Sequence, residues 1–87
     1  MKSMNFETWQ KIGLNLLFYR RQRNMTQMEL AEKCGISRNY IQRIETAASS
    51  CTLDTLIDVA AALEIPLYKL FESVSYTHLT LPTILLV

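Results

Sequence analysis

The sequence predicts an all-α fold, a compact bundle of five short helices, from three observations. Apolar residues recur at intervals of three and four through most of residues 5–71, which is the period of a helix buried along one face. Side chains that cap helices, namely Thr26, Ser37 and Thr52, stand directly before three of these stretches. The pattern breaks at Gly35 and again at Pro66, two residue types that end or start helices.

The first helix is predicted from about Asn5 to about Arg23. Its core face is expected to hold five apolar residues spaced by three or four, Phe6, Trp9, Ile12, Leu16 and Tyr19. Gly13 beside this face permits another helix to approach closely, at up to ~1 kcal/mol in helix propensity. Leu14 and Phe18 lie one turn apart on the opposite side. They are either ordinary exposed apolar residues or a contact with a second subunit or with the C-terminal tail.

Residues 26–45 contain two short helical patterns separated by one glycine. Thr26 and Glu29 form a Thr-x-x-Glu capping box, so a helix is expected to start at about Gln27. Gly35 supplies the left-handed conformation that ends it, and Ser37 can cap a second helix. On that second helix Ile41 and Ile44 recur three apart, which predicts the face that packs against the first.

The residues left outward on the second helix are Arg38, Asn39, Gln42 and Arg43. A solvated helix face usually mixes acids and bases, whereas this set offers two arginines and two amides. Such side chains make bidentate contacts to guanine and adenine in the major groove. The alternative is the exposed polar helix of an ordinary bundle. The small Ala31, the Gly35 corner and the isoleucine spacing favour DNA reading.

At these residues the sequence resembles the helix-turn-helix of the Cro/CI repressor family, also called the XRE family, over about residues 12–71. The resemblance implies a bundle of the lambda-repressor-like type, in which Arg38, Asn39, Gln42 and Arg43 read bases. It implies phosphate contacts near the end of the first helix and around the motif. We assign these to Arg20, Arg23, Thr26, Gln27, Tyr40 and Ser49. Cations at the end of the first helix also complement its dipole, which explains Arg20 and Arg23 in part.

After Glu45 the chain departs from the family pattern of a Gly-Lys pair and a loop proline. Without that glycine, the recognition helix is expected to extend a few residues further. Thr52 then caps a fourth helix, whose predicted apolar stripe is Leu53, Leu56, Ile57, Ala60 and Leu63. Pro66 precedes a short fifth helix, where Leu67, Leu70 and Phe71 close the bundle. The resemblance implies that this helix contributes to a dimer interface, so we group Leu67 and Phe71 with Leu14 and Phe18.

Residues 1–72 are expected to form the DNA-binding domain, and residues 73–87 a C-terminal tail of different composition. The tail has no charged residue apart from His78 and ends in aliphatic side chains. It is either an arm that pairs across a dimer or non-native sequence read through from an adapter or vector, and we favour the second.

Charge and motifs narrow the function classes. The net charge of +1 hides eight Lys/Arg against four Glu in residues 1–50, where the motif lies. Cys34 and Cys51 lack metal-binding spacing, and with no signal peptide they favour a reduced, cytoplasmic compartment. The sequence contains no Gly-rich phosphate loop, no H-E-x-x-H and no G-x-S-x-G, so we expect no enzyme, cofactor or metal. It contains no apolar run of membrane-spanning length.

These observations predict a sequence-specific transcriptional regulator, and the resemblance to the Cro/CI family implies a repressor. It is expected to bind a palindromic double-stranded DNA operator as a homodimer, with half-sites one helical turn apart, ~34–36 Å. Alternatives that share the fold are an activating controller protein of a restriction-modification system, an antitoxin, and a protein-interaction module with a partner protein.

Overall fold

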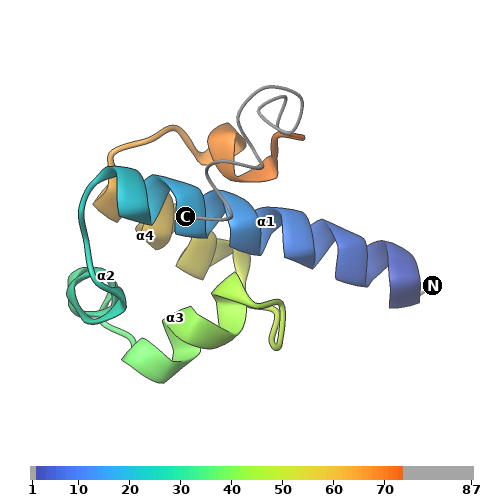
Figure 1. Ribbon diagram of the computed structural model, residues 1–87, viewed down its shortest axis with the longest axis horizontal. Coiled ribbons are helices and arrows are strands. Elements are labelled where there is room, and N and C mark those ends of the chain that lie inside the picture. The colour runs from blue at the N-terminus through green and yellow to red at the C-terminus, as the bar shows by residue number, and fades with distance from the viewer. Residues whose placement is uncertain (1, 74–87) are drawn as a thin grey trace.

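The computed structural model describes residues 2–73 of the 87-residue chain. Of the predicted tail, residues 73–87, all but Ser73 lie outside that part. The described chain forms four α-helices and one 3-10 helix (Figure 1). They are α1 (Lys2–Gln22), α2 (Gln27–Cys34), α3 (Arg38–Glu45), α4 (Leu53–Leu63) and η1 (Leu67–Phe71). Helix α1 packs against both α3 and η1, which lie on opposite sides of it in Figure 1.

The all-α prediction is confirmed, but the fifth helix is a 3-10 helix and not an α-helix. Only five residues separate Pro66 from Glu72, and the turn closes through a bond from the Lys69 N–H to the Pro66 carbonyl at 3.1 Å. The carbonyls of Leu70 and Glu72 are bound by the Asn15 amide at 2.8 and 3.0 Å. Asn15 is fully buried, so this side chain fastens η1 to α1.

The core contains Ile12 and Leu16 of α1, Leu30 and Ala31 of α2, both isoleucines of α3, and the inner face of α4. The prediction for α4 was wrong in part, since Leu53 and Ile57 are 58% and 45% exposed while Val59 is buried. Apolar residues surround most of α4, so periodicity alone does not select the face that α1 and α2 cover. Phe6, predicted in the core, is also 48% exposed.

Gly13 allows α1 and α3 to come close, as the sequence predicts. A Cβ at Gly13 would stand 2.5 Å from the Ile44 carbonyl oxygen and 2.6 Å from the Glu45 carbonyl oxygen. Both neighbours are backbone atoms at the end of α3, which cannot rotate away. The absence of a side chain at residue 13 therefore sets the distance between α1 and α3.

Every α-helix of the described chain ends in the same way, with one residue in the left-handed region. These residues are Asn24, Gly35, Ala47 and Glu64, with φ of 58°, 71°, 62° and 60°. At the end of α3, the Ala47 N–H donates to Ile44 and the Ala48 N–H donates to Arg43, the bond pattern of a Schellman motif. The predicted extension of α3 is thus wrong, because Ala47 adopts the left-handed conformation for which a glycine is usual.

Candidate nucleic-acid interface

Helices α2 and α3 begin at the capping residues predicted from the sequence. The Thr26 hydroxyl accepts from the Glu29 N–H at 3.0 Å, and the Glu29 carboxylate accepts from the Thr26 N–H at 2.8 Å, which confirms the capping box. The Ser37 hydroxyl accepts from the Tyr40 N–H at 3.0 Å and so caps α3. Gly35 between them is left-handed. The two caps and the glycine fix the angle at which α3 leaves α2.

The packing of α3 decides which of its side chains face solvent. Ile41 and Ile44 are fully buried. Arg38, Asn39 and Arg43 are exposed, and Gln42 is half-buried. Glu45, the single acid on α3, is 8% exposed and forms a salt bridge with Arg20. The outward face of α3 therefore presents cations and amides without an exposed carboxylate.

Two arginines predicted to contact phosphates, the buried Arg20 and the exposed Arg23, form hydrogen bonds within the protein. Arg20 is 8% exposed, and its guanidinium donates to the Glu45 carboxylate and, at 2.8 Å, to the Met25 carbonyl. Arg23 donates to the Leu63 carbonyl at 2.8 Å and the Glu64 carbonyl at 3.1 Å, where it satisfies the last carbonyls of α4. The position of Arg20 differs from the expectation, because its guanidinium is buried in the contact between helices, whereas Arg23 remains exposed.

The other predicted phosphate contacts flank α3. Thr26 is exposed and Gln27 half-buried at the start of α2. Beyond the other end of α3, the Ser49 hydroxyl accepts from the Arg43 guanidinium at 3.0 Å, and the Tyr40 hydroxyl donates to the Ser50 carbonyl at 3.4 Å. The Gln27 side chain thus contacts both ends of α3, at Arg38 and at Glu45, whereas Tyr40 and Arg43 contact the segment that follows α3.

Glu45 and Gln27 form a connection that sequence reasoning missed. The Gln27 amide nitrogen donates to Glu45 Oε1 at 2.8 Å, and its amide oxygen accepts from Arg38 at 2.8 Å. No local sequence pattern marks these hydrogen bonds, since the two residues in each bonded pair are 11 or more positions apart. The single carboxylate on an otherwise basic helix was the one available signal.

The residues predicted for a dimer or tail contact lie on α1 and η1. Phe71 is 41% exposed and lines an apolar depression of about 260 Å³ together with Trp9 and Ile12 of α1. Leu14 is 40% exposed, but it follows Ile12 by two residues, about 200° around the helix. The Phe18 ring packs edge-on against Tyr19 with centroids 5.0 Å apart, and Leu67 is half-buried.

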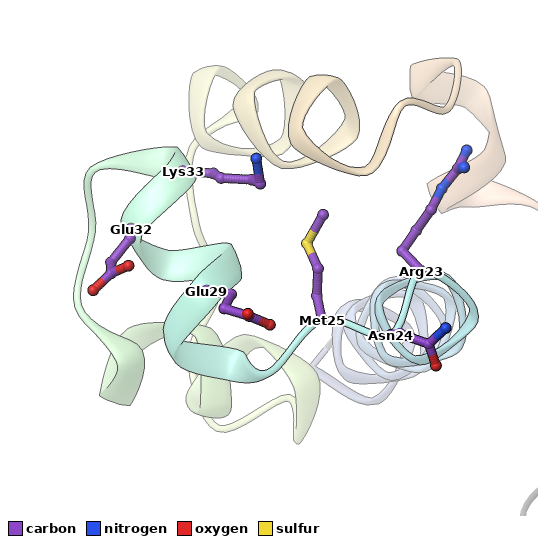
Figure 2. Close-up of a pocket in the computed structure, with 6 residues that line it drawn as sticks. All are labelled: Arg23, Asn24, Met25, Glu29, Glu32 and Lys33. Atoms are coloured by element: carbon purple, nitrogen blue, oxygen red, sulfur yellow. The ribbon is translucent and has the colours of Figure 1, made fainter.

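A second depression, of about 460 Å³, lies between the end of α1 and α2 (Figure 2). It carries charges of both signs, and two of them are already engaged: Glu29 in the capping box, and Arg23 at the end of α4. The other two charged residues, Glu32 and Lys33, are exposed on α2. Its lining is Arg23, Asn24, Met25, Glu29, Glu32 and Lys33.

The cysteines are free thiols with no sign of activation. Both are half-buried. Burial raises the pKa of the Cys34 thiol, with a smaller contribution from the negative charge of Asp58, and burial likewise raises the pKa of Cys51. A raised pKa keeps a thiol protonated at neutral pH and lowers its reactivity. Residues 2–73 contain no cluster of three metal-ligating side chains. Within the same range, none of the helices combines the length and apolarity needed to cross a membrane.

Comparison with known proteins agrees with this geometry. A family profile described as Helix-turn-helix matches residues 16–70. The chain is 41% identical over 54 residues to the immunity repressor protein of Bacillus phage phi105, a match that covers 62% of this chain and 38% of the repressor. It is 41% identical over 56 residues to control protein C.SmaI of Serratia marcescens, covering 64% of this chain and 67% of that protein.

Two solved structures share the fold. The restriction-modification controller protein C.AhdI from Aeromonas hydrophila superposes with a TM-score of 0.71 at 28% identity, covering 72% of this chain and 96% of that one. The hypothetical transcription factor NHTF from Neisseria gives a TM-score of 0.75 at 27% identity, covering 85% and 84%. The chain spans under two fifths of the length of the phage repressor. The chain belongs to the helix-turn-helix family of XRE-type regulators.

Proposed function

We propose that the chain is a sequence-specific transcriptional regulator that reads the major groove of double-stranded DNA with α3. The observation that carries the proposal is the composition of the exposed face of α3. Arg38, Asn39 and Arg43 point to solvent, whereas the single carboxylate, Glu45, is buried against Arg20. A face with cations and amides but no exposed acid suits an acidic polymer with hydrogen-bonding base edges.

In this proposal the side chains divide by task. Arg38 and Arg43 suit the two acceptors of guanine, and Asn39 and Gln42 suit adenine, each good pair discriminating by ~1–3 kcal/mol. Thr26 and Gln27 on one flank of α3, and Tyr40 and Ser49 on the other, contact phosphates and set the register. Arg20 and Arg23 are left out of the interface, because their guanidiniums are engaged within the protein.

We further propose that the chain acts as a homodimer on an inverted repeat, and most simply as a repressor. One α3 offers four base-reading side chains, and the net charge is only +1, so a single copy has limited affinity. Two copies double the reading set. The exposed Leu53 and Phe71 at the apolar depression between α1 and α4 give a second copy a surface to cover.

A controller protein of a restriction-modification system is the second candidate, favoured by the similarity to C.SmaI and C.AhdI. A controller protein would read DNA in the same way, but it would also activate transcription. A reporter gene behind the selected operator separates the two candidates. Expression that only falls as the protein is supplied supports a repressor, and expression that first rises supports a controller.

The DNA-reading proposal is tested by selection from a randomised duplex pool at one near-physiological salt concentration, followed by sequencing. We expect an inverted repeat with half-sites one helical turn apart. Arg38→Ala and Arg43→Ala should each relax the preference at one base pair of the half-site. Arg21→Ala is the matched control, because it removes the same charge from an exposed position outside α3 and should weaken all sequences alike. Failure of the wild-type chain to enrich any sequence would contradict the proposal.

A further inference from the structure

A series of hydrogen bonds runs from the interior of the protein to the exposed first residue of α3, Arg38. Arg20 of α1 contacts both oxygens of Glu45, with Nη2 3.2 Å from Oε1. The same Oε1 accepts from the Gln27 amide nitrogen at 2.8 Å, and the Gln27 amide oxygen accepts from Arg38 Nη1 at 2.8 Å. Three helices are joined, since Arg20 lies in α1, Gln27 starts α2, and Glu45 and Arg38 stand at the two ends of α3.

The buried carboxylate determines which way the Gln27 amide points. An ionised carboxylate accepts hydrogen bonds and donates none, so only the NH2 end of the amide can face Glu45. The carbonyl end must then face away, toward Arg38, which has donors only. If residue 45 were neutral and able to donate, both amide orientations would be allowed. The charge state of a buried residue thus fixes the polarity of a partly exposed one.

The same arrangement fixes Arg38. A solvent-exposed arginine samples many rotamers, and ordering it on binding costs free energy. Here one nitrogen of the guanidinium is bound to Gln27. The other N–H groups of Arg38 have no partner among residues 2–73. They are therefore available to acceptors on DNA. Arg38 is held by one edge and presents the other.

Arg20 holds the far end of the series in place. Besides Glu45, it donates through Nη1 to the Met25 carbonyl at 2.8 Å, in the turn between α1 and α2. Both members of the ion pair are 8% exposed. They are therefore shielded from screening by salt, and neither presents its charged group to a ligand outside the protein.

We propose that Arg20 and Glu45 are positioning residues that set the base preference of Arg38 through Gln27, without contacting DNA themselves. This inference rests on the proposed DNA-reading function and deepens it. A purely structural ion pair would affect binding to all sequences equally. A positioning pair changes the preference at the one base pair that Arg38 reads, because a mobile Arg38 serves several bases where an ordered one serves guanine.

The test compares base preference and affinity separately. Binding of the wild-type chain is measured on the selected operator and on operators changed at the Arg38 base pair, at one salt concentration. We expect the wild-type chain to prefer one base about tenfold or more. Gln27→Leu, which cuts the series but leaves the Arg20–Glu45 pair in place, should reduce that preference to roughly threefold or less, and Glu45→Gln should do the same. The preference at the base pair read by Arg43 should stay unchanged in both, as the internal control.

A double variant shows whether Glu45 acts through Gln27. In the Gln27→Leu background, Glu45→Gln should change no base preference further, since the connection is already cut. If instead both single variants lower affinity for every operator by one common factor, Arg20 and Glu45 are structural only and the proposal is overturned. Because Glu45→Gln leaves a buried Arg20 without its charge partner, folding is checked by circular dichroism. The double variant Arg20→Met, Glu45→Gln, which removes both buried charges together, replaces it if it fails to fold.

A measurement without DNA separates this inference from the proposed function. The order of the Arg38 side-chain Nε–H group is measured by ¹⁵N relaxation in the free protein. It should fall in Gln27→Leu and in Glu45→Gln, or in its replacement, the double variant Arg20→Met, Glu45→Gln. The Arg21 side chain serves as an exposed reference. Unchanged order at Arg38 overturns the inference, whether or not the protein binds DNA. Reduced order with no sequence preference in the wild-type chain would leave the mechanical link in place and refute DNA reading.

Discussion

Replacing Gly13 with alanine would improve helix propensity in α1 but would disturb the packing of α1 against α3. Alanine is favoured over glycine within a helix by ~1 kcal/mol, so helix propensity alone predicts that Gly13→Ala stabilises the protein. The structure predicts the reverse. The new Cβ would stand 2.5 and 2.6 Å from the carbonyl oxygens of Ile44 and Glu45, both backbone atoms. Relief of these contacts requires the end of α3 to move away from α1.

The magnitude follows from the two opposing effects. Overpacking a well-filled interior costs about 1–3 kcal/mol, and rigid backbone neighbours place this contact at the upper end. With the ~1 kcal/mol propensity gain subtracted, the net loss is about 2 kcal/mol. For a domain of this size each kcal/mol shifts Tm by roughly 4–8 °C, so Tm should fall by at least about 8 °C.

Denaturant unfolding followed by circular dichroism and by Trp9 fluorescence measures this loss. A matched pair at the exposed Gln10 of the same helix, Gln10→Gly and Gln10→Ala, isolates the propensity term, and there alanine should be the more stable by ~1 kcal/mol. If Gly13→Ala proved as stable as the wild-type chain, the close approach of α1 and α3 would be refuted.

Three further perturbations follow from the caps, the buried amide and the thiols. Ala47→Gly should stabilise the protein by about 1 kcal/mol in denaturant unfolding, since Ala47 has φ of 62° and glycine adopts that region without strain; a loss of stability would contradict the Schellman ending of α3. Asn15→Ala should destabilise it by about 2–4 kcal/mol and speed hydrogen exchange in η1, because the Leu70 and Glu72 carbonyls lose their donors; unchanged exchange would refute the clamp. The raised pKa values of Cys34 and Cys51 mean that the folded protein holds these protons more tightly than the unfolded chain. The stability they contribute is therefore present below the ordinary thiol pKa of about 8.5 and is lost as pH rises through the folded values. Unfolding measured from pH 7 to pH 10 should show this decline, and it should be smaller in a Cys34→Ala, Cys51→Ala variant; an equal decline in both proteins would contradict it.

Local patterns in the sequence predicted the motif because local chemistry builds it. The Thr26 capping box, the left-handed Gly35, the Ser37 cap and the buried Ile41 and Ile44 each depend on residues within four positions of one another. Such features are readable without a fold. The boundaries were less readable, since Ala47 and Glu64 occupy left-handed positions where their residue types give no signal.

The interface was predicted in composition but not in its supporting contacts. Arg38, Asn39 and Arg43 are exposed on α3 as expected, because periodicity places them opposite the isoleucines. Arg20 was expected at the surface and lies buried, since its partner Glu45 is 25 residues away and no local rule connects them. The base-reading and phosphate-contact roles themselves stay predictions.

The sequence by itself determined the helices of the motif, their caps, the turn between them and the polar character of the α3 face. These depend on short-range hydrogen bonds and on the helical period. Tertiary structure alone decided which side of the apolar α4 is buried, how closely α1 approaches α3 at Gly13, and that Arg20, Glu45, Gln27 and Arg38 form one connected series. Those features join residues distant in the chain, and their energies depend on which groups the packed helices bring within hydrogen-bonding distance.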